Sequence, residues 1–343
     1  MSDPGRAPGA AGLELVCPAG SLPALRAAVD GGADAVYLGF RDGMNARNFP
    51  GLNFSEEDAR RGIEYAHARG TRVFVAINVY PRPCSWRAAT AAVDAAGALG
   101  ADAVILADIG LLNYAAERQP ALARHLSVQG SATNWRALEF YRRRFGVRRA
   151  VLPRVLSVAQ VRRVIERTAL EIEVFGYGSL CIMVEGRCAL SSHVTGESPN
   201  THGVCSPAHA VRWEESAAGR RVRLGGVLID EFAQGEAAGY PTLCKGRFQA
   251  LGQVMHALEE PTSLNVLDIL PELLASGVRA IKVEGRQRSP AYVGQVTRAL
   301  RSAIDACLRD PEGYRPAGEH AALLTRLAEG RTHTLGAYSR PWQ

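Results

Sequence analysis

The stretch Gly32–Gly39, GADAVYLG, decides the fold, because it returns almost unchanged as Gly100–Ala107, GADAVILA. Looser copies occupy Gly146–Val151, GVRRAV, and Gly277–Ile281, GVRAI. In each copy a glycine stands where a helix would end, and a short run of apolar and β-branched residues follows it. This punctuation is typical of a chain that alternates helices with buried strands.

Strand-like apolar segments and alanine- or leucine-rich helical segments alternate along the rest of the chain. The eight strand-like segments lie near residues 13–16, 33–39, 72–78, 101–107, 125–129, 148–154, 171–178 and 279–285. Eight such units predict an α/β fold, a (β/α)8 TIM-like barrel. A doubly wound open sheet is the alternative, but no G-x-G-x-x-G follows the first strand to support it.

Composition and spacing predict one large domain with additions. Residues 1–11 are rich in Gly, Pro and Ala without periodicity, so we expect a disordered tail, followed by a single barrel domain over residues 12–343. Between the seventh and eighth strands, residues 177–279 far exceed the roughly 2 to 6 residues of an ordinary loop. This insertion should cover the barrel mouth, where loops after the strands form the active-site face. Residues 289–343 are expected to form a C-terminal helix and a tail that wraps the body.

The composition indicates a cytoplasmic protein without a membrane-spanning segment. No run approaches about 18 apolar residues, and the first residues lack an apolar signal core. In a reducing compartment, seven cysteines favour metal binding or catalysis over disulfides. The net charge of +6 and a pI near 9.1 permit RNA, anionic metabolites or an acidic partner. Arginine-rich helix faces such as Arg142–Arg144 are more often simply solvated.

Three cysteines fall in the stretch Ser179–Pro207, SLCIMVEGRCALSSHVTGESPNTHGVCSP, and a fourth follows in TLCKGR. The expected metal ligands are therefore Cys181, Cys188, Cys205 and Cys244. Their spacing, C-x6-C-x16-C-x38-C, is neither the paired spacing of zinc ribbons nor the compact ferredoxin run, so zinc and an iron–sulfur cluster both remain open. A glycine near each cysteine favours the cluster, because small residues let backbone amides approach cluster sulfurs.

Strand alternation assigns polar side chains to the inside of the barrel. In the fifth strand Leu126 and Val128 must face the helices, and the seventh and eighth strands follow the same reasoning. The side chains assigned inward are His125, Ser127, Gln129, Glu171, Glu173, Lys282 and Glu284. Such a lining is too polar for an ordinary core, because buried charges are costly unless they are paired. One interpretation is a self-satisfied network of salt bridges, and the other is a binding site.

The binding-site interpretation draws on residues near the mouth ends of the strands. Arginine suits such a site, because its planar guanidinium pairs with a carboxylate through two hydrogen bonds. We therefore expect a small carboxylated molecule to bind there. The substrate-binding candidates are Asn78, Arg154, Glu173, Lys282, Glu284 and Arg286.

Four residues are candidates for catalysis, namely His125, Gln129, Glu185 and Arg187. Glu185 and Arg187 lie between the first two cysteines, where they either serve acid–base chemistry or order the loop through hydrogen bonds. No G-x-S-x-G, H-E-x-x-H or G-x4-G-K-[ST] motif occurs. The familiar serine-hydrolase, zinc-protease and P-loop functions are therefore not indicated.

Several stretches resemble one known family, the U32 peptidase-like proteins, and in particular its branch for oxygen-independent ubiquinone biosynthesis. These stretches are ELVCPAGSLPALRAAVDGGADAVYLG, ARNFPGLNF, the cysteine stretch with its extension AHAVRW, and KVEGRQRSPAYV. The resemblance runs from about Leu13 to the terminal LGAYSRPWQ. It implies that the four cysteines hold a [4Fe-4S] cluster. A peptidase activity is not expected, because no nucleophile or metal motif for it is present.

The resemblance further implies an oxygen-independent hydroxylase subunit that forms a heterodimer with a UbiV-like protein and acts on rings of ubiquinone precursors. Prephenate is the implied oxygen donor, and a lipid-carrier protein is a further partner to consider. Related members hydroxylate tRNA or ribosomal RNA, so hydroxylation of an RNA base is the alternative, although nucleic acid is not the expected partner. A non-catalytic subunit that presents the precursor or the cluster is the third hypothesis.

Overall fold

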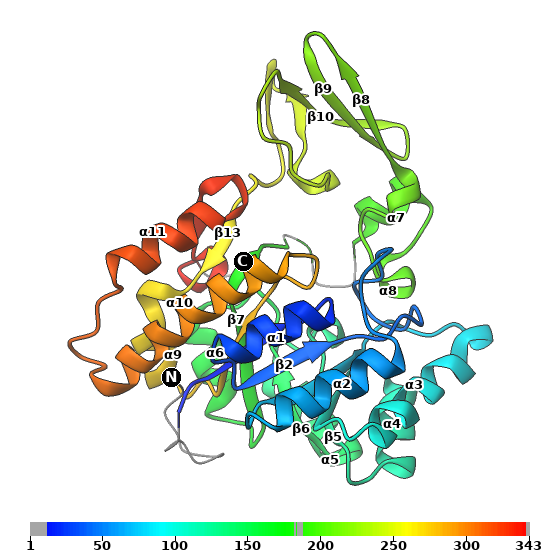
Figure 1. The fold of residues 1–343 in the computed structure, drawn as a ribbon, viewed down its shortest axis with the longest axis vertical. Coiled ribbons are helices and arrows are strands. Elements are labelled where there is room, and N and C mark those ends of the chain that lie inside the picture. Colours follow the sequence, from blue (N-terminus) through cyan, green and yellow to red (C-terminus); the bar gives the residue numbers. More distant parts are fainter. Residues whose placement is uncertain (1–11, 182, 184–187, 341–343) are drawn as a thin grey trace.

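The computed structural model describes residues 12–181, 183 and 188–340 (Figure 1). The predicted tail of residues 1–11 and the catalytic candidates Glu185 and Arg187 lie outside these residues. Within the described ranges, no helix combines the length and the apolar character that are needed to cross a membrane.

Eight parallel strands of the described chain form a closed barrel at the centre of the molecule (Figure 1). They are β1 Glu14–Pro18, β2 Ala35–Leu38, β3 Arg72–Ile77, β4 Ala103–Leu106, β5 Ala123–Leu126, β6 Val147–Val151, β7 Glu171–Ser179 and β14 Ala280–Val283. From β1 to β7 each strand pairs with the next, and β14 pairs with both β1 and β7, which closes the barrel. The TIM-like barrel predicted from the sequence is confirmed, and each predicted strand segment overlaps one observed strand.

A ring of helices surrounds this barrel. In chain order they are α1 Leu22–Asp30, α2 Glu56–His67, α3 Trp86–Ala98, α4 Ile109–Arg118, α5 Trp135–Phe145, α6 Val158–Ile165, α9 Leu270–Ala275 and α10 Pro290–Arg309. Most begin at a side chain that accepts a hydrogen bond from a backbone N–H of the first turn, namely Ser21, Ser55, Asp108, Asn134, Ser157 and Ser289. Each such N-cap stabilises its helix by about 1 kcal/mol, so the sequence fixes where the helices start.

Alternate residues of the strands belong to two separate apolar clusters. In β1, Leu15 and Cys17 face outward and pack under the helices, whereas Val16 faces into the barrel. The inner cluster also contains Tyr37 and Phe74. This period of two is the pattern expected of barrel strands.

Short 3-10 helices connect several elements. They are η1 Pro83–Ser85, η2 Val128–Gly130, η3 Ala208–Ala210, η4 Leu243–Lys245, η5 Leu267–Ile269, η6 Glu329–Arg331 and η7 Gly336–Tyr338. The predicted fifth strand continues to residue 129, but the observed strand ends at Leu126 and η2 follows. The cause is Ser127, whose hydroxyl accepts a hydrogen bond from the N–H of Gln129 at 3.2 Å and starts a turn.

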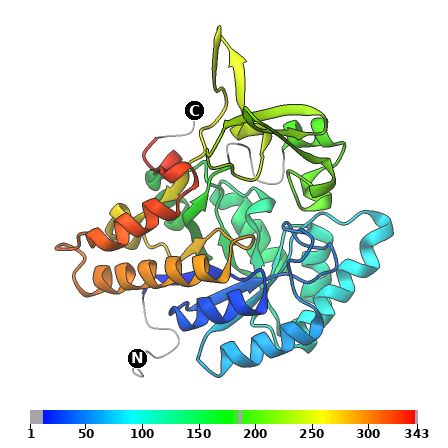
Figure 2. The same cartoon turned by 45° about the horizontal axis from the view of Figure 1, so that its top comes forward.

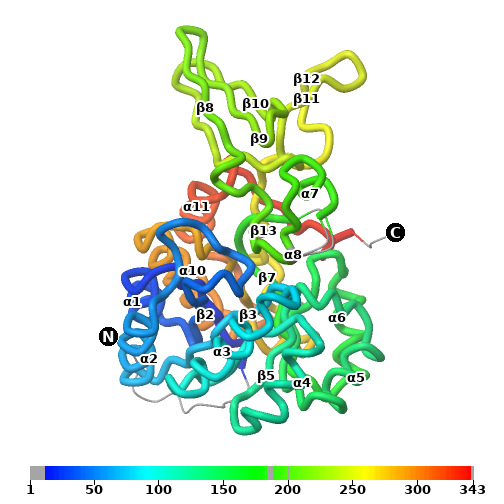
Figure 3. Tube along the Cα trace, turned by 90° about the vertical axis from the view of Figure 1, so that its right-hand side faces the viewer, coloured from blue at the N-terminus to red at the C-terminus, as the bar shows by residue number. Residues whose placement is uncertain are grey.

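The insertion after β7 rises above the mouth of the barrel (Figures 1 and 3). It contains α7 Ala189–Thr195, α8 Pro199–His202, β8 Val211–Ser216, β9 Gly219–Leu224, β10 Val227–Ala233, β11 Arg247–Ala250 and β12 Gln253–His256. Strands β8 to β10 form an antiparallel sheet over a small core, and β11 and β12 form a hairpin. The apolar run VRLGGVLID, residues 222–230, forms parts of the two strands β9 and β10, because Gly225 and Gly226 adopt positive φ and turn the chain.

The chain then returns to the barrel through β13 Ser263–Asn265, which pairs antiparallel with the end of β7. The segment after Pro261 therefore begins as a strand before α9. After α10, helix α11 Gly318–Leu327 packs beside it (Figure 2), and β15 His333–Thr334 pairs with β13. The hydroxyl of Tyr338 donates to the carbonyl of Phe175 at 2.7 Å, so the end of the chain is fixed to β7.

Candidate functional site

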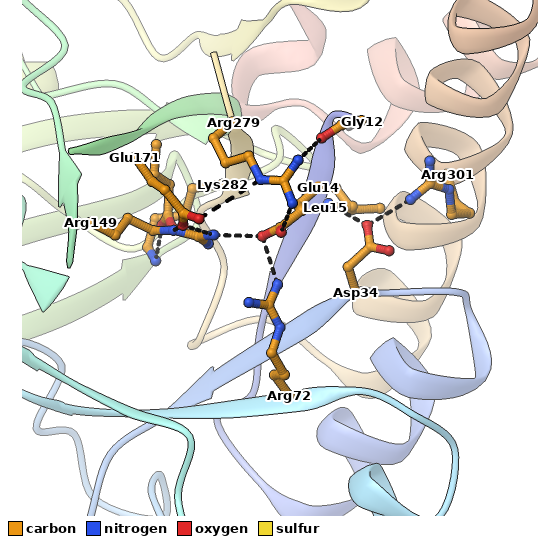
Figure 4. Close-up of polar contacts among 11 residues, drawn as sticks. Gly12, Glu14, Leu15, Asp34, Arg72, Arg149, Glu171, Arg279, Lys282 and Arg301 are labelled. Atoms are coloured by element: carbon orange, nitrogen blue, oxygen red, sulfur yellow. Dashed lines mark hydrogen bonds and ion pairs between the residues drawn. The ribbon is translucent and has the colours of Figure 1, made fainter. Parts of the chain in front are cut away.

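A network of ion pairs fills the barrel at the N-terminal ends of its strands (Figure 4). The fully buried guanidinium of Arg149 lies 2.7 Å from Glu14 and 2.6 Å from Glu171. It also lies 3.4 Å from Glu173, and Glu14 in turn lies 2.7 Å from Arg72. Burial alone would raise the pKa of Glu14, but Arg149 and Arg72 lower it below its ordinary value. Charges that are buried and paired in this way support the fold and are not free for a ligand.

Glu173 and Lys282 are both predicted to bind substrate, but they form an ion pair with each other above this network. The ammonium of Lys282 donates to Glu173 at 2.7 Å and lies 3.8 Å from the centre of the Tyr37 ring. Burial lowers the pKa of Lys282, and Glu173 offsets only part of that effect. For these two residues the arrangement matches the salt-bridge interpretation of the sequence.

The catalytic candidate His125 also lies inside the barrel. Its ring meets Phe74 edge-on, with 4.6 Å between the ring centres. Burial, followed by the charges of Arg149 and Lys282, holds the pKa of His125 well below its ordinary value. The imidazole is therefore neutral near pH 7 and packs as part of the interior.

The mouth of the barrel holds a second group of polar residues, built around Arg286. This buried guanidinium donates to Oδ1 of Asn45 at 3.0 Å, and Asn45 donates to the carbonyl of Phe40 at 2.9 Å. Gly39 makes room for both, because a Cβ there would lie 2.7 Å from Arg286 and 2.6 Å from Asn45. Burial lowers the pKa of Arg286 to about 10, so the group stays charged at neutral pH.

Glu284 is the carboxylate of the mouth. It lies 3.4 Å from the guanidinium of Arg47, which comes from the loop between β2 and α2. Burial would raise the pKa of Glu284, but Arg47 and Arg154 lower it below its ordinary value. Arg154 donates to the carbonyl of Ser179 and stacks 4.3 Å from the centre of the Phe175 ring. In the described part of the mouth, the guanidinium groups of Arg47, Arg154 and Arg286 thus surround the carboxylate of Glu284, an excess of positive charge that suits an anionic ligand.

Two amide side chains complete the mouth. Asn78 accepts a hydrogen bond from the N–H of Ala46 at 2.9 Å and donates to Ser127 at 3.0 Å. Gln129 is buried, and its Oε1 has no hydrogen-bond partner among the described residues. A buried acceptor without a partner is costly, so this atom favours a ligand that presents an N–H or O–H.

The predicted ligands Cys181, Cys188, Cys205 and Cys244 lie near one another in the loops over the mouth. Burial, followed by the neighbouring Cys181 and Cys205, raises the pKa of Cys244 to about 11. Cys205 is exposed to solvent, but desolvation by the atoms packed around its thiol raises its pKa, which Arg47 lowers and Cys188 raises further. Arg47 and the other cysteines thus lie within electrostatic range of the thiols of Cys205 and Cys244.

The chemistry of this donor set fits an iron–sulfur cluster or zinc, since both are held by four thiolates. The sulfur of Cys188 accepts a hydrogen bond from the backbone N–H of Ser191 at 3.4 Å, a contact of the kind that tunes cluster sulfurs. Gly203 has a φ of +80°, and a Cβ there would lie 2.3 Å from the carbonyl of Asn45, so the cysteine loop touches the mouth. Among the described residues, no three His, Cys, Asp or Glu side chains are arranged around one point as single-ion ligands.

Lys245, next to Cys244, ties the cysteine loops to the body. Its ammonium donates to Ser179 at 2.9 Å and to Glu329 at 2.6 Å. Ser179 ends β7, and Glu329 lies in η6 near the C-terminus. The position of Cys244 therefore depends on three segments that are far apart in the sequence.

A hollow of about 190 Å³ opens beside the mouth, between the loops after β2 and β3 and helix α8. Its lining combines apolar Met44 and Val79 with the polar side chains of Arg82, Thr201 and His202. This hollow lies where the insertion meets the barrel.

The structure separates the predicted residues into two groups. Asn78, Gln129, Arg154, Glu284 and Arg286 lie around the mouth, whereas His125, Glu173 and Lys282 lie deeper in the barrel. Sequence reasoning missed Asn45, Arg47 and Lys245. Arg47 is the second residue of the stretch ARNFPGLNF, which carries part of the family resemblance, and Asn45 directly precedes this stretch, so the sequence held a signal for both.

Comparison with known proteins gives consistent matches over most of the chain. The sequence model of the protein family described as Peptidase family U32 matches residues 20–336. The tRNA hydroxylation protein P1 of Bacillus subtilis is 30% identical over 325 residues, which cover 94% of this chain and 70% of that protein. The tRNA hydroxylation protein P of Escherichia coli is 31% identical over 313 residues, 85% of this chain and 68% of that protein. The 23S rRNA 5-hydroxycytidine C2501 synthase of Escherichia coli is 29% identical over 320 residues, 93% of this chain and 42% of that protein.

Proposed function

The chain belongs to peptidase family U32, and from this premise we propose that it hydroxylates an RNA base at the mouth of its barrel. Relatives from two bacteria are named for the hydroxylation of tRNA and of 23S rRNA. The observation that carries the proposal is the arrangement of the mouth, where the guanidinium groups of Arg47, Arg154 and Arg286 and the carboxylate of Glu284 lie next to the cysteine loops. Proteolysis is not proposed, since no hydrolase or metalloprotease motif is present.

Cys181, Cys188, Cys205 and Cys244 would hold a [4Fe-4S] cluster. Bound there, the cluster would supply one-electron chemistry beside the mouth without molecular oxygen. Four thiolates leave no free coordination position for the ring, so the ring and the oxygen donor are bound by the side chains of the mouth. Arg47, whose charge lowers the pKa of Cys205, is placed to balance the negative charge of the thiolates.

Hydroxylation without oxygen gas requires a donor of the hydroxyl group. The ring exchanges a C–H bond for a C–OH bond and is oxidised by two electrons. The donor exchanges its C–OH bond for a C–H bond and is reduced by two electrons, so atoms and electrons balance. The guanidinium groups of Arg47, Arg154 and Arg286 suit a small dicarboxylated donor of the prephenate class, because each can pair with a carboxylate through two hydrogen bonds.

Two further side chains have roles at the ring. Glu284 is ionised at neutral pH because Arg47 and Arg154 lower its pKa, so its carboxylate can accept the proton that leaves the ring carbon. The unpaired Oε1 of Gln129 can accept a hydrogen bond from a ring N–H or an exocyclic amino group and so orient the base. An RNA base would reach both groups only after it leaves its stack, as in other enzymes that modify bases.

The ring of a ubiquinone precursor is the second candidate substrate. The cysteine stretch and both ends of the chain resemble the ubiquinone branch of the family, which supports this candidate together with a UbiV-like partner. The same mouth, donor and cluster would serve either ring. If the partner supplies the reacting residues, the present chain is the subunit that binds and presents the precursor.

Mass spectrometry of a deletion strain grown without oxygen distinguishes these functions. We expect one hydroxylated nucleoside of tRNA or rRNA to disappear, and to return with the wild-type gene or with Cys84→Ala, an exposed cysteine outside the cluster loops. Cys205→Ala should not restore it. Loss of ubiquinone with unchanged nucleosides would replace RNA by the quinone precursor as substrate. Unchanged levels of both would refute hydroxylation by this chain.

A further inference from the structure

One segment of the chain carries more positive charge than the whole. Residues 118–170 contain twelve arginines, no lysine and two acidic residues, Glu139 and Glu166, a net charge of +10. The complete chain carries +6, so the other 290 residues together carry −4. Such a concentration of charge in one part of a fold indicates a polyanionic partner.

Besides Arg162, which donates to Ser276, six of these arginines are exposed on the outer wall of the barrel, on α5, at the start of β6, and on or just after α6. We call them the arginine face, and they are Arg136, Arg143, Arg144, Arg148, Arg163 and Arg167. Helices α5 and α6 are neighbours (Figure 3), and Thr168 after α6 donates to Glu139 of α5 at 2.9 Å. In the described part of the chain, Arg143 forms an ion pair with Glu139, and the other five form none. Glu166 is the exposed acidic residue beside them.

The arginines of α5 form a row that starts near the mouth. Counted from Arg136, Phe140 is four positions further along the helix, Arg143 seven and Arg144 eight. The four side chains therefore lie along one stripe of the helix surface. The helix begins six residues after Gln129 of the mouth and runs about 16 Å along the barrel wall, at about 1.5 Å per residue. A strand of RNA whose base enters the mouth can therefore continue along this row.

Aromatic rings lie between these arginines. A hollow of about 460 Å³ is lined by Trp135, Arg136, Glu139, Phe140, Arg143 and Arg144. Phe140 is 52% exposed, and Tyr141 and Phe145 hold its ring edge-on at 5.7 Å. Rings on which bases can stack, next to groups that bind phosphate, are typical of surfaces for single-stranded nucleic acid.

A simpler explanation accounts for only part of this face. Cations stabilise the last turn of a helix through its dipole, which explains arginines such as Arg143 and Arg144 at the end of α5. Arg136 lies in the first turn, where the dipole disfavours a cation, and Arg148 lies in a strand. The dipole therefore gives no reason for these two positions, whereas a polyanion does.

We propose that the arginine face binds the phosphate backbone of the RNA whose base enters the mouth. The identity of the occupant rests on the proposed function, and the location rests on the charge and geometry of the face. An anionic membrane is disfavoured, because Phe140 is the only large apolar side chain among the described residues of this face that is exposed. A membrane-binding helix would present several such side chains.

The test compares two triple variants of the full chain for binding to an unmodified tRNA transcript, by fluorescence anisotropy at several salt concentrations. Arg136→Gln, Arg144→Gln and Arg148→Gln together remove charge from the face. Arg220→Gln, Arg221→Gln and Arg223→Gln together are the matched control, because these exposed arginines of β9 are paired with glutamates. Thermal unfolding confirms that both variants are folded.

We expect the face variant to bind tRNA at least about tenfold more weakly at 0.15 M salt, and the control to bind like the wild type. The slope of log K against log salt should fall by about 2 to 3, at roughly 0.7–0.9 per lost phosphate contact. Equal binding by face variant and wild type, or equal loss in both variants, would overturn the proposal. So would face-dependent binding to phosphatidylglycerol vesicles without binding to tRNA.

The same variants separate this inference from the proposed function. If the face variant hydroxylates tRNA with a raised KM and an unchanged kcat, both stand. If tRNA binding depends on the face but no hydroxylated nucleoside forms, the proposed reaction fails and the binding surface remains. If hydroxylation proceeds with wild-type KM in the face variant, the reaction stands and the inference fails.

Discussion

Arg47 and Glu284 meet at 3.4 Å across the barrel mouth, although 237 positions separate them in the chain. The pair joins the loop after β2 to the end of β14, the last strand of the barrel. The charge of Arg47 also lowers the pKa of Cys205, so one guanidinium acts on both the carboxylate of Glu284 and the cysteine loop. A change at Glu284 should therefore affect the chemistry and the binding of the donor in different ways.

Glu284→Gln removes the proton acceptor and frees Arg47. We expect kcat to fall at least about 100-fold, within the range for loss of a general base. The KM for an anionic donor should stay equal or fall, because one competing carboxylate is gone. Steady-state kinetics with the loaded protein measures both constants, and Glu319→Gln, an exposed carboxylate, is the control. A wild-type kcat in Glu284→Gln would exclude this residue as the base.

Two glycines of the cysteine loops provide a matched pair. Gly203→Ala and Gly196→Ala both place a side chain at positive φ, +80° and +72°. At Gly203 the new Cβ would also lie 2.3 Å from the carbonyl of Asn45, whereas at Gly196 nothing lies within 4 Å. We expect Gly203→Ala to lose cluster iron and the broad absorption near about 400 nm, and Gly196→Ala to keep both. Equal iron content in the two variants would show that contact with the mouth does not position the loop.

Arg149→Met tests the buried network at the other end of the barrel. It leaves Glu14, Glu171 and Glu173 without a shared cation, and loss of one partner of a buried pair costs about 3–5 kcal/mol. The neighbour Arg148 is exposed, so Arg148→Met should change the free energy of unfolding by less than about 0.5 kcal/mol. Urea unfolding of both variants at pH 7 provides the comparison. A similar small change in both would contradict the structural role of the network.

The pH dependence of the same variants has a defined sign. In the wild type, Arg149 and Arg72 lower the pKa of Glu14 below its ordinary value. The contribution of this carboxylate to stability is therefore complete above the ordinary pKa of a glutamate and is lost as the pH falls through the lowered pKa. Without Arg149 this pKa rises, and protonation relieves the unpaired charge. The destabilisation of Arg149→Met should therefore be largest near pH 7 and smaller near pH 5. A destabilisation that grows as the pH falls would contradict this account.

The sequence predicts the barrel and the cysteine loops because both have local signals. A glycine before a short apolar run marks several of the strands. Cysteine is itself a signal, because its thiol is a common metal ligand. Which side chains of a strand point inward is harder to predict where two successive residues are of the same type. Arg148 and Arg149 are adjacent and identical, yet one is exposed and the other is fully buried, and the choice depends on acidic residues contributed by β1 and β7.

The mouth shows the same limit. Alternation along the fifth strand assigns Gln129 to the inside, and the residue does lie at the mouth, but a 3-10 turn started by Ser127 brings it there. Asn45 and Arg47 come from a loop without periodicity, so pattern reasoning has no basis for placing them. Their positions follow from contacts with β14 and with the end of α8, which only the folded chain brings together.

The most direct test of the proposed reaction follows the oxygen atom. The loaded protein is incubated without oxygen gas with an unmodified tRNA transcript and prephenate that carries 18O in its hydroxyl group, and the nucleosides are analysed by mass spectrometry. We predict a hydroxylated nucleoside that contains the label, and none with Cys205→Ala. A hydroxylated nucleoside without the label, or labelled quinone precursor in a parallel reaction with no modified nucleoside in the tRNA, would contradict the account.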